Sequence, residues 1–231
     1  MSGAGAGAGR PGPRRPRALL FDWDSTLVDN WRSIEEALNA TLVAMGQAPW
    51  TPEETRARVR VSMRESFPVL FGQRWTEARR IFYERITALH LRHLAPLPGA
   101  EAMLAELAAE GFYLGVVSNK TGTLLRKEAA YLGWEPFFGG VVGAGDAVRD
   151  KPDPAPVGLA LQASGIAPGR EVWFVGDTAL DMLCALNAGC VPVLIAGQAG
   201  GGDDFSAAPP EWQVPDCFSL CALVRAGARP I

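Results

Sequence analysis

The sequence contains little cysteine or histidine, and neither is arranged as in a metal site. It has two histidines and four cysteines, all four in the last quarter of the chain: Cys184, Cys190, Cys217 and Cys221. A structural zinc site needs paired ligands at short spacing, as in CxxC, and the cysteines form no such pair. The N-terminal residues also lack the apolar run of a secretory signal. We therefore expect reduced thiols and a cytoplasmic protein.

An excess of basic charge and a convincing membrane span are also missing. The net charge is −3, whereas proteins that bind nucleic acid carry a basic surface. Residues 1–17 hold four arginines among Gly, Ala, Pro and Ser, so we expect a disordered basic tail there. Residues 182–202 are uncharged, but Pro192 and five glycines favour a helix end, a strand and a loop over a membrane helix. Neither a nucleic acid nor a membrane is therefore an expected partner.

The apolar pattern that is present alternates between short strands and helices. Strands are predicted at residues 18–23, 112–117, 140–142, 172–175 and 191–195. Helices are predicted between the later strands, at about 100–110, 121–132, 154–164 and 179–188. Strands that alternate with helices are typical of a parallel sheet covered on both faces. The predicted fold class is α/β, with a Rossmann-like three-layer α/β/α core.

A helical segment interrupts this pattern directly after the first strand. Apolar residues from Ile34 to Met45 recur at helical spacing, and a second helix begins at Thr51-Pro52 with a capping Thr and Pro at the first position. A third helix is predicted from Trp75 to about His93. We therefore divide the chain into a core, residues 18–29 and 96–231, and a helical cap, residues 30–95.

Polar residues gather at the ends of the predicted strands. In chain order they are Asp22, Asp24 and Thr26, then Ser118 and Asn119, then Lys151 in a loop, then Asp177 and Asp181. The carboxyl ends of parallel strands share one edge, where ligands bind. Four clustered carboxylates need a cation, and oxygen ligands favour Mg²⁺. A divalent ion and Lys151 together suit a phosphoryl group.

The two aspartates that follow the first strand can take separate roles. Asp22 and Asp24 lie two residues apart where the first strand ends, and we expect their side chains to diverge. One carboxylate can attack phosphorus, while the other gives a proton to the leaving oxygen and later takes one from water. The residues alone leave open which carboxylate does which.

Taken together, these motifs resemble those of the haloacid dehalogenase superfamily. Asp22-x-Asp24-x-Thr26, Ser118, Lys151 and Gly176-Asp177-x3-Asp181 occur in the order and spacing of that superfamily's four motifs. The resemblance covers residues 18 to about 195. The helical segment stands at the insertion point used by the phosphoglycolate-phosphatase-like branch.

The resemblance implies a role for each motif residue. Asp22 corresponds to the nucleophile that forms an aspartyl-phosphate, and Asp24 to the general acid/base, which Thr26 orients. Mg²⁺ is implied to bind Asp22, the backbone carbonyl of Asp24 and Asp177, with Asp181 acting through water. Phosphate oxygens are implied to be held by Ser118, the Asn119 backbone and Lys151.

Several further residues either depart from a motif or belong to none. Ser25 replaces the usual Gly of the family, which is tolerable unless the turn needs a positive φ. Lys120 is expected to be solvated, and His90 and His93 to be surface or packing residues. The candidates for substrate contact in or near the cap are Trp31, Arg32, Arg64 and Phe67.

The predicted activity is that of a Mg²⁺-dependent phosphatase acting on a small phosphorylated metabolite. Asp24 argues against a dehalogenase, which does without an acid there, and the absence of lysine from residues 30–95 argues against phosphonatase imine chemistry. A phosphomutase acting on a sugar phosphate is the alternative, followed by a non-catalytic phosphate-binding module. The sequence carries no signal for the substrate's identity or the oligomeric state.

Overall fold

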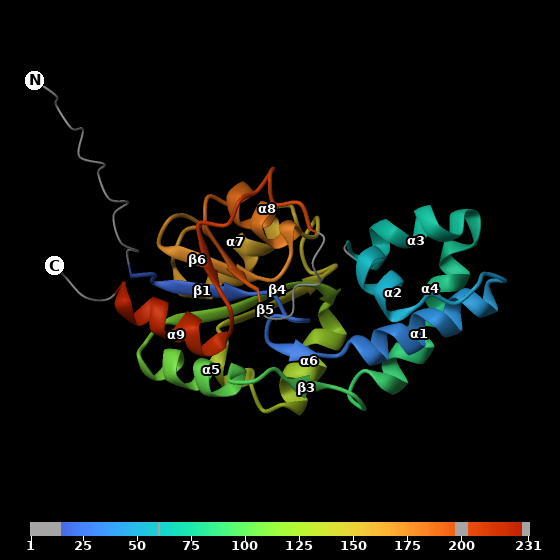
Figure 1. Cartoon of the computed structure of the whole chain (residues 1–231), viewed down its shortest axis with the longest axis horizontal. Coiled ribbons are helices and arrows are strands. Elements are labelled where there is room, and N and C mark those ends of the chain that lie inside the picture. Colours follow the sequence, from blue (N-terminus) through green and yellow to red (C-terminus); the bar gives the residue numbers. More distant parts are fainter. Residues whose placement is uncertain (1–14, 60, 197–202, 228–231) are drawn as a thin grey trace, which may run out of the picture.

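A six-stranded parallel sheet forms the centre of the computed structural model, which describes residues 15–59, 61–196 and 203–227 (Figure 1). The strand order is β5-β4-β1-β6-β7-β8, and every neighbouring pair is parallel. The strands are β1 (Ala18–Phe21), β4 (Tyr113–Thr121), β5 (Gly140–Ala144), β6 (Val172–Gly176), β7 (Val191–Ile195) and β8 (Trp212–Val214). This sheet confirms the predicted α/β fold class.

Helices cover both faces of the sheet. Alternate residues of β1 point to opposite faces, as the strand period requires. Leu19 and Phe21 pack in one cluster with α5 (Ala100–Ala109), α6 (Gly122–Tyr131) and α9 (Cys217–Ala226). Ala18 and Leu20 pack in a second cluster with α7 (Ala155–Leu161) and α8 (Ala179–Asn187). Figure 1 shows α5 and α9 on one side of the sheet and α7 and α8 on the other.

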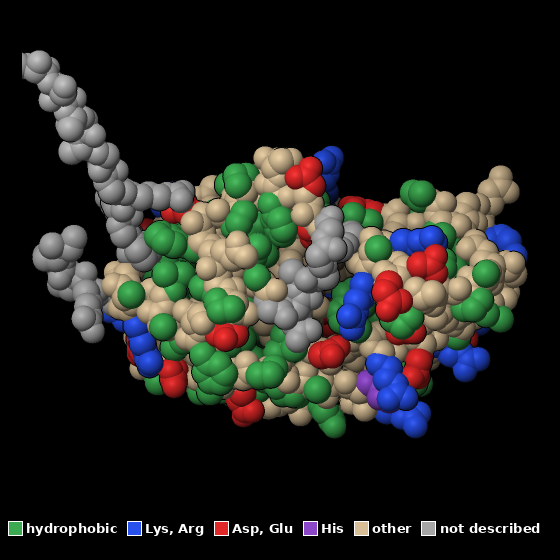
Figure 2. Space-filling view, in the orientation of Figure 1, with side chains coloured by type: hydrophobic (Ala, Val, Ile, Leu, Met, Phe, Trp, Pro, Cys, Tyr) green, Lys and Arg blue, Asp and Glu red, His purple; other side chains and the backbone are tan. Residues whose placement is uncertain are grey.

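Four helices gather at one end of the molecule, beyond the sheet (Figure 1). They are α1 (Trp31–Ala44), α2 (Pro52–Arg58), α3 (Met63–Phe71) and α4 (Trp75–Leu89). The apolar faces of α1, α3 and α4 share a cluster around Leu42, Phe67 and Phe82. We call residues 30–95 the cap. The chain enters and leaves it through two short antiparallel strands, β2 (Val28–Asp29) and β3 (Ala95–Pro96). Arginines are interspersed with acidic side chains on the surface of this end (Figure 2).

The helices and strands differ from the predicted ones in several places, and β2 and β3 were not predicted. The second cap helix is two helices, since α2 ends at Arg58 and the β-branched Val59 and Val61 lie outside both helices. The helix that follows ends at Leu89 instead of near residue 93. Strand β4 continues to Thr121, which pairs with Ala144 of β5. Neither β8 nor α9 was predicted; the three residues of β8 are too few for a periodic signal, and the ten-residue helix α9 was missed.

Smaller features complete the description. Three 3-10 turns lie at Gly72–Arg74, Glu135–Phe137 and Gln162–Ser164. The first fourteen residues of the predicted tail lie outside the described residues, whereas its last three contact the core: the Arg17 backbone N–H donates to the Glu171 carbonyl. All four cysteines are buried free thiols. Within the described ranges, no helix combines the length and apolar character needed to cross a membrane.

Candidate active site

The strand order brings the predicted motifs to one edge of the sheet. Strands β4, β1 and β6 are neighbours, and the polar residues follow their carboxyl ends. Asp22 comes directly after β1, and its N–H donates to the carbonyl of Val175, so the ladder with β6 continues to this residue. Asp177 comes directly after β6. The sheet therefore places the two aspartates side by side.

Three buried carboxylates form a compact acidic cluster. Oxygen atoms of Asp22, Asp177 and Asp181 all lie within 4.8 Å of one another. Asp181 is at the third position of α8, where it forms a reciprocal capping box with Thr178. Gly176 lies so close to the Asp181 side chain that any Cβ at this position would clash with it. This close approach explains the glycine before Asp177.

Burial and mutual repulsion raise the pKa values of two carboxyl groups in this cluster. Burial, and then the neighbouring carboxylates of Asp181 and Asp22, raise the pKa of Asp177 well above its usual value. Burial likewise raises the pKa of Asp22, against the opposing effect of Lys151. Carboxylates in this situation are stabilised by a cation. Three oxygen donors of this kind fit a divalent ion such as Mg²⁺.

Lys151 supplies the positive charge that the cluster does have. Its Nζ lies 2.7 Å from Asp22 Oδ1 and 2.6 Å from Asp181 Oδ1, and its side chain is 3% exposed. Although burial opposes the charged form, the two carboxylates raise the pKa of Lys151 above its usual value. The side chain of Asn119 holds the Lys151 backbone, accepting from its N–H at 3.0 Å and donating to its carbonyl at 3.2 Å. Lys151 is therefore a fixed ammonium beside Asp22.

Asp24 occupies a different environment from Asp22. Its Oδ1 lies 2.9 Å from Lys120 Nζ, and it is not among the three carboxylates of the acidic cluster. Burial raises the pKa of Asp24 to about 6 despite the charge of Lys120. The divergence predicted for the two side chains is thus observed. A carboxyl group with this pKa can both donate and accept a proton near neutral pH.

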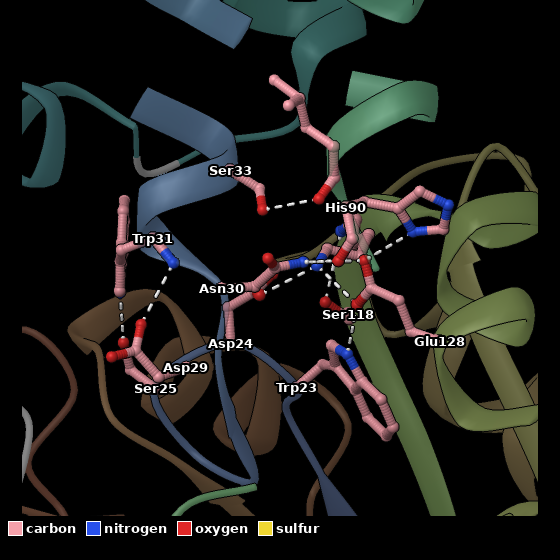
Figure 3. A network of polar contacts seen from close by, with 12 residues as sticks. Trp23, Asp24, Ser25, Asp29, Asn30, Trp31, Ser33, His90, Ser118 and Glu128 are labelled. Atoms are coloured by element: carbon pink, nitrogen blue, oxygen red, sulfur yellow. Dashed lines mark hydrogen bonds and ion pairs between the residues drawn. The ribbon is translucent and has the colours of Figure 1, made fainter. Parts of the chain in front are cut away.

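The structure differs from the residue-level expectations at Thr26, Ser25 and Lys120. Thr26 donates to Asp177 Oδ1 at 3.2 Å, so its hydroxyl contacts the acidic cluster. Ser25 adopts a φ of +63°, the left-handed conformation that disfavours serine. Its hydroxyl accepts from Trp31 Nε1 at 2.6 Å, which ties the turn to the first cap helix (Figure 3).

Lys120 was expected to be solvated, but its side chain is 7% exposed. It lies between Asp24 and Glu128, with Nζ 2.7 Å from Glu128 Oε2. Glu128 is fully buried and also accepts from His90, which had been expected at the surface or in packing. Figure 3 shows Trp23, Asn30 and His90 directed toward Glu128. A signal was available, because Glu128 stands on the apolar face of α6 with Leu125 and Ala129.

A cavity of about 190 Å³ lies between the cap and these residues. On the core side it is lined by Asp22, Asp24, Ser118, Asn119, Lys120, Lys151, Asp177 and Asp181. The cap contributes mainly apolar side chains, including Trp31 and Phe67, together with Arg58. Of the other cap candidates, Arg32 pairs with Glu36 on the surface and Arg64 pairs with Asp150 of the core.

Comparisons with known proteins agree with this geometry. Residues 19–195 match the family of haloacid dehalogenase-like hydrolases. A phosphoglycolate phosphatase of Xanthomonas campestris pv. campestris is 32% identical over 205 residues, which cover 87% of this chain and 90% of that protein. One of Photorhabdus laumondii subsp. laumondii is 29% identical over 216 residues, covering 90% and 92%.

The fold is shared with solved structures as well. A haloacid dehalogenase-like hydrolase of Streptococcus pneumoniae superposes with a TM-score of 0.79 at 24% identity, covering 90% of this chain and 98% of that one. The family match spans every motif residue from Asp22 to Asp181 and more than half of the chain. The chain therefore belongs to the haloacid dehalogenase-like hydrolases.

Proposed function

We propose that this hydrolase is a Mg²⁺-dependent phosphatase that acts on a small phosphomonoester through a phospho-aspartate at Asp22. The observation that carries the proposal is the position of the Asp22 carboxylate, between the ammonium of Lys151 at 2.7 Å and the acidic side chains of Asp177 and Asp181. With a metal ion held by those acidic side chains, the Asp22 carboxylate would have positive charge on both sides and could approach an anionic phosphate ester. The two phosphoglycolate phosphatase relatives support this reaction class.

The acidic cluster would hold the metal ion. Asp22 and Asp177 would provide carboxylate oxygens, with the backbone carbonyl of Asp24 beside them. Both oxygens of Asp181 already have partners, one in Lys151 and the other in Thr178, which supports a contact through water. When bound, Mg²⁺ supplies positive charge that offsets the repulsion among the carboxylates and the phosphate oxygens.

In the proposed reaction, Asp22 and Asp24 take part in different bond changes. A carboxylate oxygen of Asp22 forms a bond to phosphorus as the bond from phosphorus to the ester oxygen breaks. Asp24 donates its proton to that ester oxygen, and the alcohol leaves. Asp24 then accepts a proton from the water that attacks phosphorus, which frees phosphate and restores Asp22. The raised pKa of Asp24, about 6, supports both roles.

The remaining motif residues would bind the phosphoryl group. Ser118 is buried and lines the cavity at the end of β4, with Asn119 next to it. Lys151 lies within reach of an oxygen on a phosphorus held by Asp22. The cap closes the cavity over this point and contacts the organic part of the substrate, which sets specificity. Phosphoglycolate is the first substrate to test, because it is the one named for the relatives.

Phosphate release from a panel of phosphomonoesters tests the proposal. The panel contains phosphoglycolate, sugar phosphates and nucleoside monophosphates, each with Mg²⁺ and with EDTA. We expect release with Mg²⁺ from at least one ester, no release with EDTA, and none from Asp22→Asn. Isomerisation of a hexose phosphate without phosphate release would identify a mutase. No turnover by a folded, Mg²⁺-loaded protein would overturn the proposed catalysis.

A further inference from the structure

We propose that Glu128, acting through Lys120, is a positioning residue that holds the Asp24 carboxylate and ties it to both chain connections of the cap. The inference rests on the proposed role of Asp24 as the proton donor. It assigns a function to a buried carboxylate that lies outside the four motifs of the family. The close-up in Figure 3 shows the groups on which it depends.

Glu128 is a fully buried carboxylate with a complete set of donors. Its Oε2 accepts from Trp23 Nε1 and from Lys120 Nζ, both at 2.7 Å. Its Oε1 accepts from Asn30 Nδ2 at 2.9 Å and from His90 Nδ1 at 3.0 Å. Burial of a charged group is costly unless every acceptor site is used, as it is here. A side chain required only for packing at this site would be apolar.

The Lys120 ammonium links this carboxylate to the catalytic one. It lies 2.7 Å from Glu128 and 2.9 Å from Asp24, between two negative charges. Glu128 is fixed by its place on α6, where Leu125 and Ala129 pack into the core. The ammonium is therefore held from the core side, and it presents a fixed donor to Asp24. Trp23, which lies between the two catalytic aspartates in sequence, is held by the same carboxylate.

The other oxygen of Glu128 binds the two connections between core and cap. Asn30 directly precedes α1, and His90 directly follows α4. Asn30 Nδ2 also donates to the His90 carbonyl at 2.9 Å, so the connections are bonded to each other as well. Movement of the cap about these connections must therefore disturb the contacts of Glu128. The position of Asp24 is coupled in this way to the position of the cap.

A matched pair of substrates separates positioning from general support. Phenyl phosphate and 4-nitrophenyl phosphate have similar size, but phenolate is a poor leaving group that needs the Asp24 proton, whereas nitrophenolate leaves as a stable anion. Misplacing Asp24 should therefore reduce kcat/KM mainly for phenyl phosphate. For Glu128→Gln and Lys120→Met we expect a loss at least about tenfold larger on phenyl phosphate than on 4-nitrophenyl phosphate.

Four further variants complete the experiment. Asp24→Asn gives the largest selective loss, and Glu84→Gln, an exposed glutamate of α4, gives none. His90→Ala should show the selective loss through the cap connection, and His90→Asn should restore part of it, because its amide can donate to Glu128. Thermal unfolding shows whether each variant folds. If Glu128→Gln does not fold, Lys120→Met tests the same contact.

The outcomes distinguish this inference from the proposed function. Equal losses of kcat/KM on the two esters, or no loss, would show that Glu128 and Lys120 do not position the proton donor. A selective loss in Glu128→Gln without one in His90→Ala would remove the coupling to the cap. Failure of the wild-type protein to release phosphate with Mg²⁺ from either aryl ester and from every member of the phosphomonoester panel would instead overturn the phosphatase itself.

Discussion

Asp22 and Lys151 are 129 positions apart in the sequence, and the Lys151 Nζ lies 2.7 Å from the Asp22 Oδ1. The contact joins the end of β1 to a loop that reaches the same edge of the sheet. It leaves one Asp22 oxygen without a lysine partner, and in the proposed function this oxygen attacks phosphorus. The proposed function places the chemistry at this pair.

Replacement of Asp22 by asparagine should abolish turnover, because an amide cannot form the phospho-enzyme. We expect a loss of more than about a thousandfold in kcat for Asp22→Asn, as for other enzymes that lose their nucleophile. Phosphate release under saturating Mg²⁺ measures it, with circular dichroism to establish that the variant folds. Asp204→Asn, at an exposed position, is the matched control and should retain full activity. Residual turnover near the wild-type rate would contradict the mechanism.

Mg²⁺ should stabilise the folded protein through the acidic cluster. Asp22, Asp177 and Asp181 come together only in the fold, so an ion that binds them raises the free energy of unfolding. We expect the melting temperature to rise with Mg²⁺ concentration in the wild-type protein, and much less in Asp177→Asn. Differential scanning calorimetry after EDTA treatment measures the effect. An Asp177→Asn variant that responds to Mg²⁺ as the wild type does would place the metal elsewhere.

The metal-free protein should become less stable as the pH rises. Burial raises the pKa of Asp22 and of Asp177, and brings that of Asp24 to about 6 from 3.8. A carboxyl group with a raised folded-state pKa contributes stability that is present below the unfolded value and is lost as the pH passes the folded value. Urea denaturation in EDTA should thus give a larger free energy of unfolding at pH 5 than at pH 8. The difference should be smaller in Asp24→Asn, and an undiminished difference would argue against this origin.

Substitutions of Ser25 should separate backbone strain from its hydrogen bond. The φ of +63° costs a non-glycine residue about 1 kcal/mol, and the bond from Trp31 contributes about as much. Ser25→Gly removes both and should change stability little. Ser25→Ala keeps the strain and loses the bond, so the free energy of unfolding should fall by about 1 kcal/mol. Chemical denaturation of the three proteins gives the order, and an alanine variant as stable as the wild type would show that the bond contributes nothing.

Weakening the contact between cap and core should reduce apparent substrate affinity. Arg64 of α3 forms an ion pair with Asp150 at 2.7 Å and a hydrogen bond to its other oxygen at 2.9 Å, next to Lys151. Arg64→Gln would make the closed cap less populated, so KM should rise about threefold to tenfold with a smaller change in kcat. Arg80→Gln, which breaks an exposed pair within α4, is the control. An unchanged KM would show that this pair does not hold the cap closed.

Much of the architecture could be predicted from local patterns. Apolar runs such as residues 18–21 and 191–195 are unambiguous strands, and the helices between them follow from periodicity and capping residues such as Thr51. Short elements could not be predicted, because β8 has three residues and its pairing with β7 supplies the order that its sequence lacks. The break between α2 and α3 could not be predicted either, because no Pro or Gly marks it.

The candidate site was predicted in composition but not in its contacts. Asp22, Asp24, Ser118, Lys151, Asp177 and Asp181 all line the cavity, because each lies near the carboxyl end of a strand, in the first turn of α8 or in the loop before α7. The partner of Thr26, the burial of Lys120 and the role of Glu128 were missed. The partner of Thr26 depends on β1 and β6 being neighbours, and the burial of Lys120 and the contacts of Glu128 depend on the packing of α6 against β4. These contacts join segments that are far apart in the sequence, and only the place of Glu128 on the apolar face of α6 gave a local signal.

The sequence by itself determined the α/β class, the helical segment after the first strand and the chemistry at the strand ends, since these depend on residue type and short-range spacing. Only the tertiary structure decided which lysine holds which aspartate: Lys151 pairs with Asp22 and Lys120 with Asp24. Such pairs are set by strand order and helix packing over more than ninety residues. In a buried site, the partner of each charge decides what it can do, because little water is present to stabilise it.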